Sequence, residues 1–453
     1  MMGRLDRSEP LFYVVKLEEL VPPDHLLRRV DRLLNFGPLV EELRPYYASV
    51  GRPSIDPELM LRMLLVGYFY GIGSERRLVE EVQLNLAYRW FCGLALDASV
   101  PDASTFSKNR HGRFHEADVF RRVFESVVDL CRKAGLADGD ALSVDGSFIG
   151  ADASASAGRR TPGSEPPADW ATTPDGQRRC VRAYLEGLDT EAGFSEAEPL
   201  AKELAFVPKY PSVTDPQAAW SRVRNVGRFG YKAHFLIDNA HAIIVDAEGT
   251  DSRLSNEIVA ARRMVERQRT DGHPGPALLA ADKSYGTGSF LGWLDRQGIE
   301  PMIPVLDRTQ QTDGKFGRDQ FTFDPERDLF ICPTGHELTR RGADVVGQGA
   351  RYRASARDCS ACALKPRCTN AKARKLERHP DEDVRERVRA LSSTPAFAVA
   401  ARARRKVEAR FAHMKHVTGL EKLRLRGLSG AKEQVLLAAA ALNLRSLAKR
   451  CPA

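Results

Sequence analysis

Three acidic residues stand where they could hold divalent metal ions. Asp145 lies in the segment ALSVDGSFIG, where alternating apolar and polar residues predict a half-buried strand that ends at Gly146. Asp282 ends a second apolar segment, ALLAAD, and Glu408 lies within the basic segment ARARRKVEARFAHMKH. Hard divalent cations prefer oxygen ligands, and two such ions about 3.5–4 Å apart can activate a nucleophile and stabilise a leaving oxygen in phosphoryl transfer. These three acids are therefore a candidate metal-binding set.

The segment around Glu408 is predicted to be an amphipathic helix. At about 100° per residue, Arg404, Glu408 and Lys415 fall on one stripe of this helix. A neighbouring apolar stripe is suited to packing on a sheet and consists of Val407, Phe411 and Met414. A cationic stripe beside a metal site would suit a ligand that carries phosphates. The alternative is an ordinary surface helix with Arg–Glu pairs four residues apart, which are common.

Basic residues are concentrated close to Glu408. Residues 401–430 contain nine Lys and Arg and two Glu, while the whole chain of 453 residues has a net charge of +8. A patch of this kind supplies salt-dependent, sequence-independent affinity for a phosphate backbone. The charge distribution therefore indicates a polyanionic partner.

The composition is that of a globular protein long enough for two or three domains, with 43% hydrophobic and 28% charged residues. The N-terminus carries acids and lacks the apolar core of a signal peptide. The longest apolar run, VLLAAAAL, is too short to span a bilayer. Without an export signal, the eight cysteines indicate reduced thiols or metal ligands. We expect a cytoplasmic protein with no membrane partner.

Residues 14–136 are predicted to be mostly helical, with helix starts at Asp24, Pro57, Ser74 and Asp102. Two of these helices flank the segment DASVPDAS and could form a helix-turn-helix motif. The second helix is basic, with Lys108, Arg110 and Arg113. The alternative is a helical bundle with a solvated basic face.

The central part of the chain predicts a mixed sheet with helices on its faces, an α/β layer architecture. After the Asp145 strand comes an irregular insertion at about 152–222. A hairpin, a helix, the Asp282 strand, a short helix and a further strand follow. Residues 307–395 are expected to form a second insertion with short β-like alternation followed by a charged helical stretch, KLERHPDEDVRERVRAL, and residues 396–453 return to helices.

Four cysteines cluster in the second insertion with the spacing C-x26-C-x2-C-x5-C. They are Cys332, Cys359, Cys362 and Cys368. Such a set could form a tetrahedral structural zinc site, in which His336 could replace one ligand. The alternative is four unligated thiols, because the last step lies just beyond the usual C-x2–4-C range.

Taken together, these motifs resemble the core of DDE-class insertion-sequence transposases. The similar segments are VDGS, GYKAHFLID, ADKSYG, the R-x3-E-x6-K pattern of Arg404, Glu408 and Lys415, LRLRGL and ALNLRSL. The segments GRPSIDPELMLRMLLVGYFYGI and PDASTFSK resemble the helical domain that often precedes this core. One position departs from the family's fuller signature, which has a Tyr where this chain has Ala401.

The resemblance implies an RNase H-like fold in which Asp145, Asp282 and Glu408 bind Mg²⁺ or Mn²⁺. The implied activity is cleavage at the ends of an insertion sequence and transfer of the freed 3′ end to target DNA. The partner would be double-stranded DNA, with a homodimer assembled on it and a place beside the bacterial nucleoid. The basic residues expected to contact DNA are Arg404, Arg405, Lys415, Arg424 and Arg426. The cysteines resemble those in the insertion of related transposases.

The expected domains are a helical N-terminal DNA-binding domain at 1–136, a catalytic core at 137–306 and 396–453, and a cysteine-containing insertion at 307–395. Two other functions remain open at this stage. One is a metal-dependent DNA nuclease on the same fold, which would cut DNA without joining it. The other is a DNA-binding protein that has lost catalysis, which the presence of all three acids disfavours.

Overall fold

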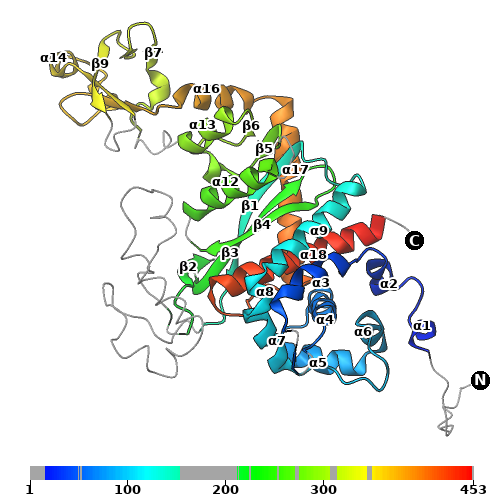
Figure 1. The fold of residues 1–453 in the computed structure, drawn as a ribbon. Coiled ribbons are helices and arrows are strands. Elements are labelled where there is room, and N and C mark those ends of the chain that lie inside the picture. The colour runs from blue at the N-terminus through cyan, green and yellow to red at the C-terminus, as the bar shows by residue number, and fades with distance from the viewer. Residues whose placement is uncertain are drawn as a thin grey trace, which may run out of the picture. The chain divides into compact units, whose positions relative to one another are not determined.

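The computed structural model describes residues 16–48, 50–51, 54–153, 212, 214–223, 226–252, 255–270, 275–306, 314–343 and 349–450. The chain divides into two compact units. Unit 1 comprises Met1–Gly139, Asp145–Asp271 and Lys406–Ala453, and unit 2 comprises Asp140–Val144 and Gly272–Arg405. Strand β1 (Ala141–Gly150) and helix α17 (Pro395–His416) each contribute residues to both units (Figure 1).

The N-terminal part of unit 1 is helical, as predicted. Its α-helices are α1 (Leu17–Leu20), α2 (Leu26–Asp31), α3 (Gly37–Leu43), α4 (Pro57–Phe69), α5 (Glu75–Leu84), α6 (Leu86–Phe91), α7 (Ala103–His111), α8 (Arg113–Glu116) and α9 (Val119–Lys133), with the 3₁₀-helix η1 (Arg44–Tyr46) after α3. The predicted start signals operate through hydrogen bonds to free backbone amides. The side chains of Asp56, Ser74 and Asp102 accept such bonds at the starts of α4, α5 and α7.

The sheet of unit 1 is built around the long strand β3 (Val226–Asp238). Its first half pairs with β2 (Ala219–Val223), and its second half pairs with β4 (Ile244–Asp251), both antiparallel. The hairpin of β3 and β4 confirms the prediction from alternating residues. Strand β1 lies on the other side of β3.

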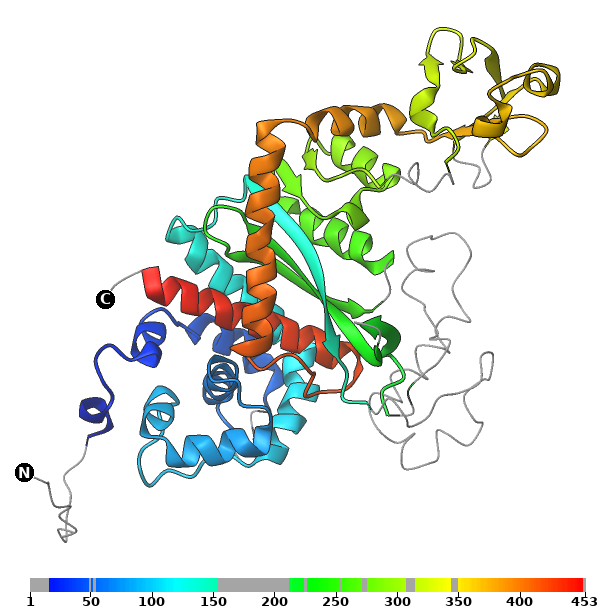
Figure 2. The same ribbon diagram turned by 180° about the vertical axis from the view of Figure 1, so that it is seen from behind.

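The two faces of this sheet carry different helices. On one face, Lys232 of β3 forms an ion pair with Glu257 of α12 (Ser255–Thr270). On the other face, Phe235 of β3 belongs to a core shared with the second half of α17 and with α18 (Gly427–Arg450). Figure 2 shows the face that carries α17 and α18.

Helix α18 holds unit 1 together. It is buried along most of its length and packs against α2, α4 and α9 as well as β4. Asn443 lies within this buried stretch and binds the backbone of β4. Its Oδ1 accepts a hydrogen bond from Ile244 N at 2.9 Å, and its Nδ2 donates one to Ile244 O at 2.8 Å. The prediction that this helix packs against the sheet is confirmed.

Unit 2 contains a parallel part and an antiparallel part. In the parallel part, residues Ala141–Ser143 of β1 pair with β5 (Leu278–Ala280), which pairs with β6 (Glu300–Met302). The 3₁₀-helix η3 (Lys283–Tyr285) and helix α13 (Gly288–Arg296) lie between these two strands in the chain. Phe397 and Ala400, from the first half of α17, pack against Ala280 and Met302.

The cysteine-containing insertion forms a five-stranded antiparallel sheet in the order β11-β10-β9-β8-β7. The strands are β7 (Thr322–Asp324), β8 (Leu329–Ile331), β9 (Glu337–Ala343), β10 (Ala350–Ala354) and β11 (Lys375–Arg378). The helices are η5 (Arg318–Gln320), α14 (Ala356–Ser360), α15 (Lys365–Cys368) and α16 (Glu382–Leu391). The small β-rich insertion is therefore confirmed.

The strand order β4-β3-β1-β5-β6, with β2 as a further partner of β3, is that expected of an RNase H-like sheet. The mixed α/β class with an N-terminal helical region is confirmed. The predicted domain ranges stay a prediction.

Three local predictions were wrong or incomplete. Strand β1 does not end at Gly146 but continues to Gly150, where Leu423 N donates to Gly150 O at 2.7 Å. Residues 375–378, expected as part of a charged helix, form strand β11 because they pair with β10. The expected irregular insertion at 152–222 ends in strand β2, and most of it lies outside the described residues.

Replacement of Asn443 by Leu should destabilise unit 1. The change leaves the Ile244 N–H and C=O buried without partners, at a cost of roughly 2–5 kcal/mol. Urea unfolding of the purified variant measures this loss. Ser446→Ala is the matched control on the same helix, because the Ser446 hydroxyl bonds only to Leu442 O of its own helix. Equal stability of the Asn443→Leu variant and the unaltered protein would contradict the prediction.

Candidate active site

Asp145 is a half-buried residue in the middle of β1. Its Oδ1 accepts a hydrogen bond from Gly146 N at 2.7 Å. The next residue, Gly146, faces α12, since a Cβ built there would lie 2.9 Å from His234 Nδ1 and 3.5 Å from Glu257 Oε1. Successive side chains of a strand point to opposite faces. Asp145 therefore projects to the face that carries Phe235 and the second half of α17.

Gly146 and His234 support this strand from the opposite face of the sheet, a contact that was not predicted from the sequence. His234 is fully buried on β3, and its Nε2 lies 2.8 Å from Thr250 Oγ1. Burial, together with the nearby Lys232 ammonium, lowers the pKa of His234 to about 3, so the imidazole is neutral. Its ring fills the space beside Gly146, where a larger residue would collide with it. The signal in the sequence was a histidine within the alternating segment GYKAHFLID.

Glu408 lies on the second half of α17, which is fixed to the sheet of unit 1 by its apolar stripe. Val407, Phe411 and Met414 are buried, as predicted. The Phe411 ring stacks on Phe235 with centroids 4.6 Å apart and planes 7° apart. Glu408, next to Val407 in the chain, is exposed. Asp145 and Glu408 thus belong to one unit and to the same face of its sheet.

Polar bonds hold the same half of α17 to the turn between β3 and β4. Lys406 Nζ donates to Ala240 O at 2.9 Å, and Arg410 Nε donates to Ala242 O at 2.6 Å. Two of the basic residues beside Glu408 therefore serve the fold. This use was not predicted from the sequence, because the carbonyl groups belong to a distant turn.

Asp282 belongs to unit 2, two residues beyond the end of β5. It is half-buried and caps η3. Its Oδ1 accepts hydrogen bonds from Ser284 N at 2.8 Å and from Ser284 Oγ at 2.5 Å. In the parallel pairing of unit 2, Ser143 of β1 is opposite Ala280 of β5. Asp145 and Asp282 each follow these partners by two residues in the chain.

The predicted DNA-contacting residues differ in their surroundings. Arg405 is exposed, while Arg404 and Lys415 are half-buried. Arg426 is engaged within unit 1, where its Nη2 lies 3.0 Å from Asp152 Oδ2. Arg424 is also engaged there, since its Nη2 donates a hydrogen bond to Thr418 O at 2.8 Å.

The basic segment of the suggested helix-turn-helix forms α7 and the start of α8, and its three basic side chains do not form one exposed face. Arg110 is buried and forms an ion pair with Glu75 Oε1 at 2.7 Å. The guanidinium of Arg113 lies 4.3 Å above the Tyr47 ring. Lys108 is exposed. For Arg110 and Arg113 the bundle interpretation fits better than one in which they read DNA.

The four clustered cysteines come together in unit 2. All four line a cavity of about 30 Å³, together with His336 and Phe316, among others. None forms a disulfide. Burial raises the pKa of the Cys368 thiol, an effect opposed by Arg374 and reinforced by the other three cysteines. Cys92 and Cys131 are buried singly in unit 1, and Cys180 and Cys451 lie outside the described residues.

Within the described part of the chain, no group of three or more His, Cys, Asp or Glu side chains is already arranged to hold a metal ion. In the same part, no helix is both long and apolar enough to cross a membrane.

Comparisons with known proteins match two separate parts of the chain. A family described as "Transposase domain (DUF772)" matches residues 15–112, which include helices α1 to α7. A family described as "Transposase DDE domain" matches residues 331–448, which include α17 with Glu408 and most of α18. A search of curated proteins found no match. Together the two family matches support the assignment of this chain to the DDE-class insertion-sequence transposases, the family that its motifs resemble.

Proposed function

We propose that the chain is a DNA transposase that cleaves the ends of an insertion sequence and joins them to target DNA in a divalent-metal-dependent reaction. Asp145, Asp282 and Glu408 are its proposed catalytic acids. The observation that carries the proposal is the β1–β5 register, in which Ser143 is opposite Ala280. Asp145 and Asp282 each follow this pair by two residues in the chain, which is the spacing expected of two acids that come after paired positions of neighbouring parallel strands.

The continuity of α17 supports the inclusion of Glu408. Its first half packs on Ala280 of β5 through Phe397 and Ala400, and its second half packs on Phe235 of β3. Strand β1 is the neighbour of both β3 and β5. Glu408 lies on this helix between Ala400 and Phe411, the residues of these two contacts.

The three carboxylates fit hard divalent ions, which take oxygen ligands and keep part of their water shell. When bound, such ions would activate water and then the freed 3′-hydroxyl, and would stabilise the departing oxygen. Asp145 and Asp282 would share the ions, and Glu408 would complete the second position. The bonds from Gly146 N and Ser284 hold two of the carboxylates in place. Mg²⁺ or Mn²⁺ is the proposed cofactor.

Basic residues near Glu408 would hold the DNA strand. Arg404 and Lys415 flank Glu408 on its stripe of α17, while Arg405 lies off this stripe and is exposed. Arg424 and Arg426 follow in the basic segment. We also propose that the protein forms a homodimer on DNA and lies in the cytoplasm beside the nucleoid, as the family resemblance implies.

The alternatives are a metal-dependent nuclease and a DNA-binding protein without catalysis. An assay for strand joining separates both of these from a transposase.

We also propose that Cys332, Cys359, Cys362 and Cys368 bind one structural zinc ion. They line a single cavity of about 30 Å³. Zinc binding deprotonates its cysteine ligands, and the ion would balance the charge of the resulting thiolates. The turn at Cys332 already has the backbone bond from Gly335 N to Cys332 O, at 2.8 Å.

Single replacement of Asp145, Asp282 or Glu408 by Ala should abolish strand cleavage. The loss should be at least about 1,000-fold, because metal-bound charge supplies several kcal/mol of transition-state stabilisation. DNA binding should be largely retained. The measurement is cleavage of a labelled element-end duplex with and without Mg²⁺, and Glu421→Ala, an exposed acid on the loop after α17, is the control. If one of the three variants still cleaves at the full rate, the residue replaced in it does not belong to the catalytic site.

Lys415→Ala should slow cleavage of saturating DNA, because Lys415 would position the strand and small misplacement of a reacting group is costly. Arg405→Ala should instead weaken binding only, with a fall of about one unit in the salt dependence of affinity. Single-turnover cleavage and titrations at several salt concentrations distinguish these effects. A Lys415→Ala variant that cleaves bound DNA at the unaltered rate would show that Lys415 contributes affinity alone.

Purified protein should contain about one zinc ion per chain if the tetrahedral site exists. Elemental analysis of protein prepared without added metal tests this, and Cys368→Ser should lower the content sharply. Cys92→Ser, which changes a buried cysteine of unit 1, should leave it unchanged. His336→Ala shows whether the histidine takes the place of a thiol. Zinc-free protein with four freely titrating thiols in the insertion would contradict the proposal.

A further inference from the structure

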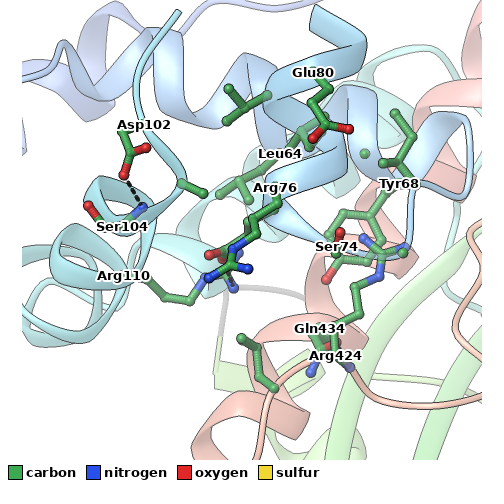
Figure 3. A pocket seen from close by; sticks show the side chains of 18 residues that line it. Leu64, Tyr68, Ser74, Arg76, Glu80, Asp102, Ser104, Arg110, Arg424 and Gln434 are labelled. Carbon is green, nitrogen blue, oxygen red and sulfur yellow. Dashed lines mark hydrogen bonds and ion pairs between the residues drawn. The ribbon is translucent and has the colours of Figure 1, made fainter.

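A pocket of about 650 Å³ lies in unit 1 among α4, α5, the start of α7 and the segment that leads into α18 (Figure 3). None of the proposed catalytic acids lines it. Its volume is in the range that holds small organic ligands. Part of its wall is apolar and is formed by Leu64, Ile72, Leu78, Val79 and Leu425. The rest is polar and includes three arginines from three different elements, namely Arg76, Arg110 and Arg424.

Arg110 is a buried residue of this wall, and only 4% of its surface is exposed. Its Nη1 forms an ion pair with Glu75, and its Nε lies 3.7 Å from Glu433 Oε2. Among the described residues, the Arg110 Nε has no hydrogen-bond partner. A buried N–H without an acceptor is costly, and a ligand oxygen would remove this cost.

Arg424 enters the pocket from another side than Arg110 (Figure 3). Its guanidinium lies 4.8 Å above the ring of Tyr68, and its Nη2 donates to Thr418 O at 2.8 Å. These contacts fix the plane of the guanidinium. Its Nε also lacks a hydrogen-bond partner within the described part of the chain. Arg424 is therefore held ready to donate to an acceptor, and guanidinium groups suit phosphate oxygens in particular.

Two helices begin at the wall of the pocket. Helix α5, of 10 residues, starts after Ser74, and α7, of 9 residues, starts after Asp102. Helix N-termini carry a partial positive charge and free backbone N–H groups. Their presence adds to the attraction that the arginines exert on an anion, while the carboxylates of Glu75 and Glu80 offer acceptors to a ligand that also has donors.

We propose that this pocket binds one unpaired nucleotide of a DNA strand. Its phosphate would contact the guanidinium groups of Arg76 and Arg424, and its base would lie against the apolar wall. Base amino groups would donate to a carboxylate such as Glu75. A base within a duplex cannot enter a concave pocket without leaving the stack, so the pocket selects unpaired positions. The inference rests on the proposed function, in which DNA is the substrate.

The test uses the full chain and three labelled duplexes of one sequence. One is fully paired, one carries a single unpaired 2-aminopurine nucleotide, and one has the same extra position without a base. Anisotropy gives the affinities, and 2-aminopurine fluorescence reports transfer of the base from water into the pocket. Arg76→Gln is the main variant because Arg76 is exposed and its replacement should leave the fold intact. Arg77→Gln is the matched control, since Arg77 is its exposed neighbour outside the pocket.

The unaltered protein should prefer the duplex with the unpaired base over both other duplexes. Arg76→Gln should reduce the preference over the fully paired duplex about tenfold, as expected for loss of a charged hydrogen bond to the phosphate, and Arg77→Gln should preserve it. Equal binding of all three duplexes by the unaltered protein would overturn the inference while leaving the proposed function intact, and an acidic peptide would then be the better candidate ligand. Equal effects of the two variants would overturn it as well. Failure to bind any of the duplexes would count against the proposed function itself.

Discussion

The packing of α17 on the sheet is the constraint on which the proposed chemistry depends. Phe411 stacks on Phe235, and Val407 and Met414 are buried beside it. Because neighbouring residues of a helix point about 100° apart, burial of Val407 fixes the direction in which Glu408 leaves the helix. An apolar contact that contains none of the proposed catalytic acids thus sets the direction of Glu408, the proposed third acid.

The acidic residues of this protein differ in burial, and this separates one that serves the fold from the three candidate acids. Asp246 is buried and neutralised, with Arg121 Nη1 and Arg267 Nε at 2.7 Å and 2.8 Å from its oxygens. Burial of an unpaired carboxylate would be too costly, so this acid belongs to the fold. The three candidate acids are instead exposed or half-buried. Hydrogen bonds from their own local backbone orient Asp145 and Asp282.

Local rules explain what could be predicted from the sequence. Alternation predicted the β3–β4 hairpin, and Pro57, Ser74 and Asp102 predicted helix starts, because each signal acts over a few residues. Predictions failed where distant partners decide. The strand was predicted to end at Gly146, yet this glycine lies inside β1, where a larger side chain would collide with His234.

The candidate site residues also differ in whether local sequence signals or distant partners determine their surroundings. The acids could be chosen from the sequence, because each follows or adjoins an apolar pattern and the family motifs mark them. The partners of Arg110 could not be foreseen, since Glu75 and Glu433 lie far from it in the chain and the side chain therefore looked like part of a solvated face. The convergence of the four cysteines on one cavity likewise depends on how β8, α14 and α15 fold back in the insertion.

The two family matches meet in a single core, and this has a consequence for how DNA binding and catalysis are related. Arg445 Nη1 of α18 donates to Phe69 O of α4 at 3.0 Å, and Arg424 stacks on Tyr68 of the same helix. Through Asn443, α18 also holds β4 of the sheet. Helices within the first matched range thus pack on α18, most of which lies within the second matched range and which also supports the sheet. A close-packed interior transmits strain rather than absorbing it. Strain caused by DNA bound to the N-terminal helices would therefore pass directly to α18. From α18 it would pass to the sheet that carries Asp145.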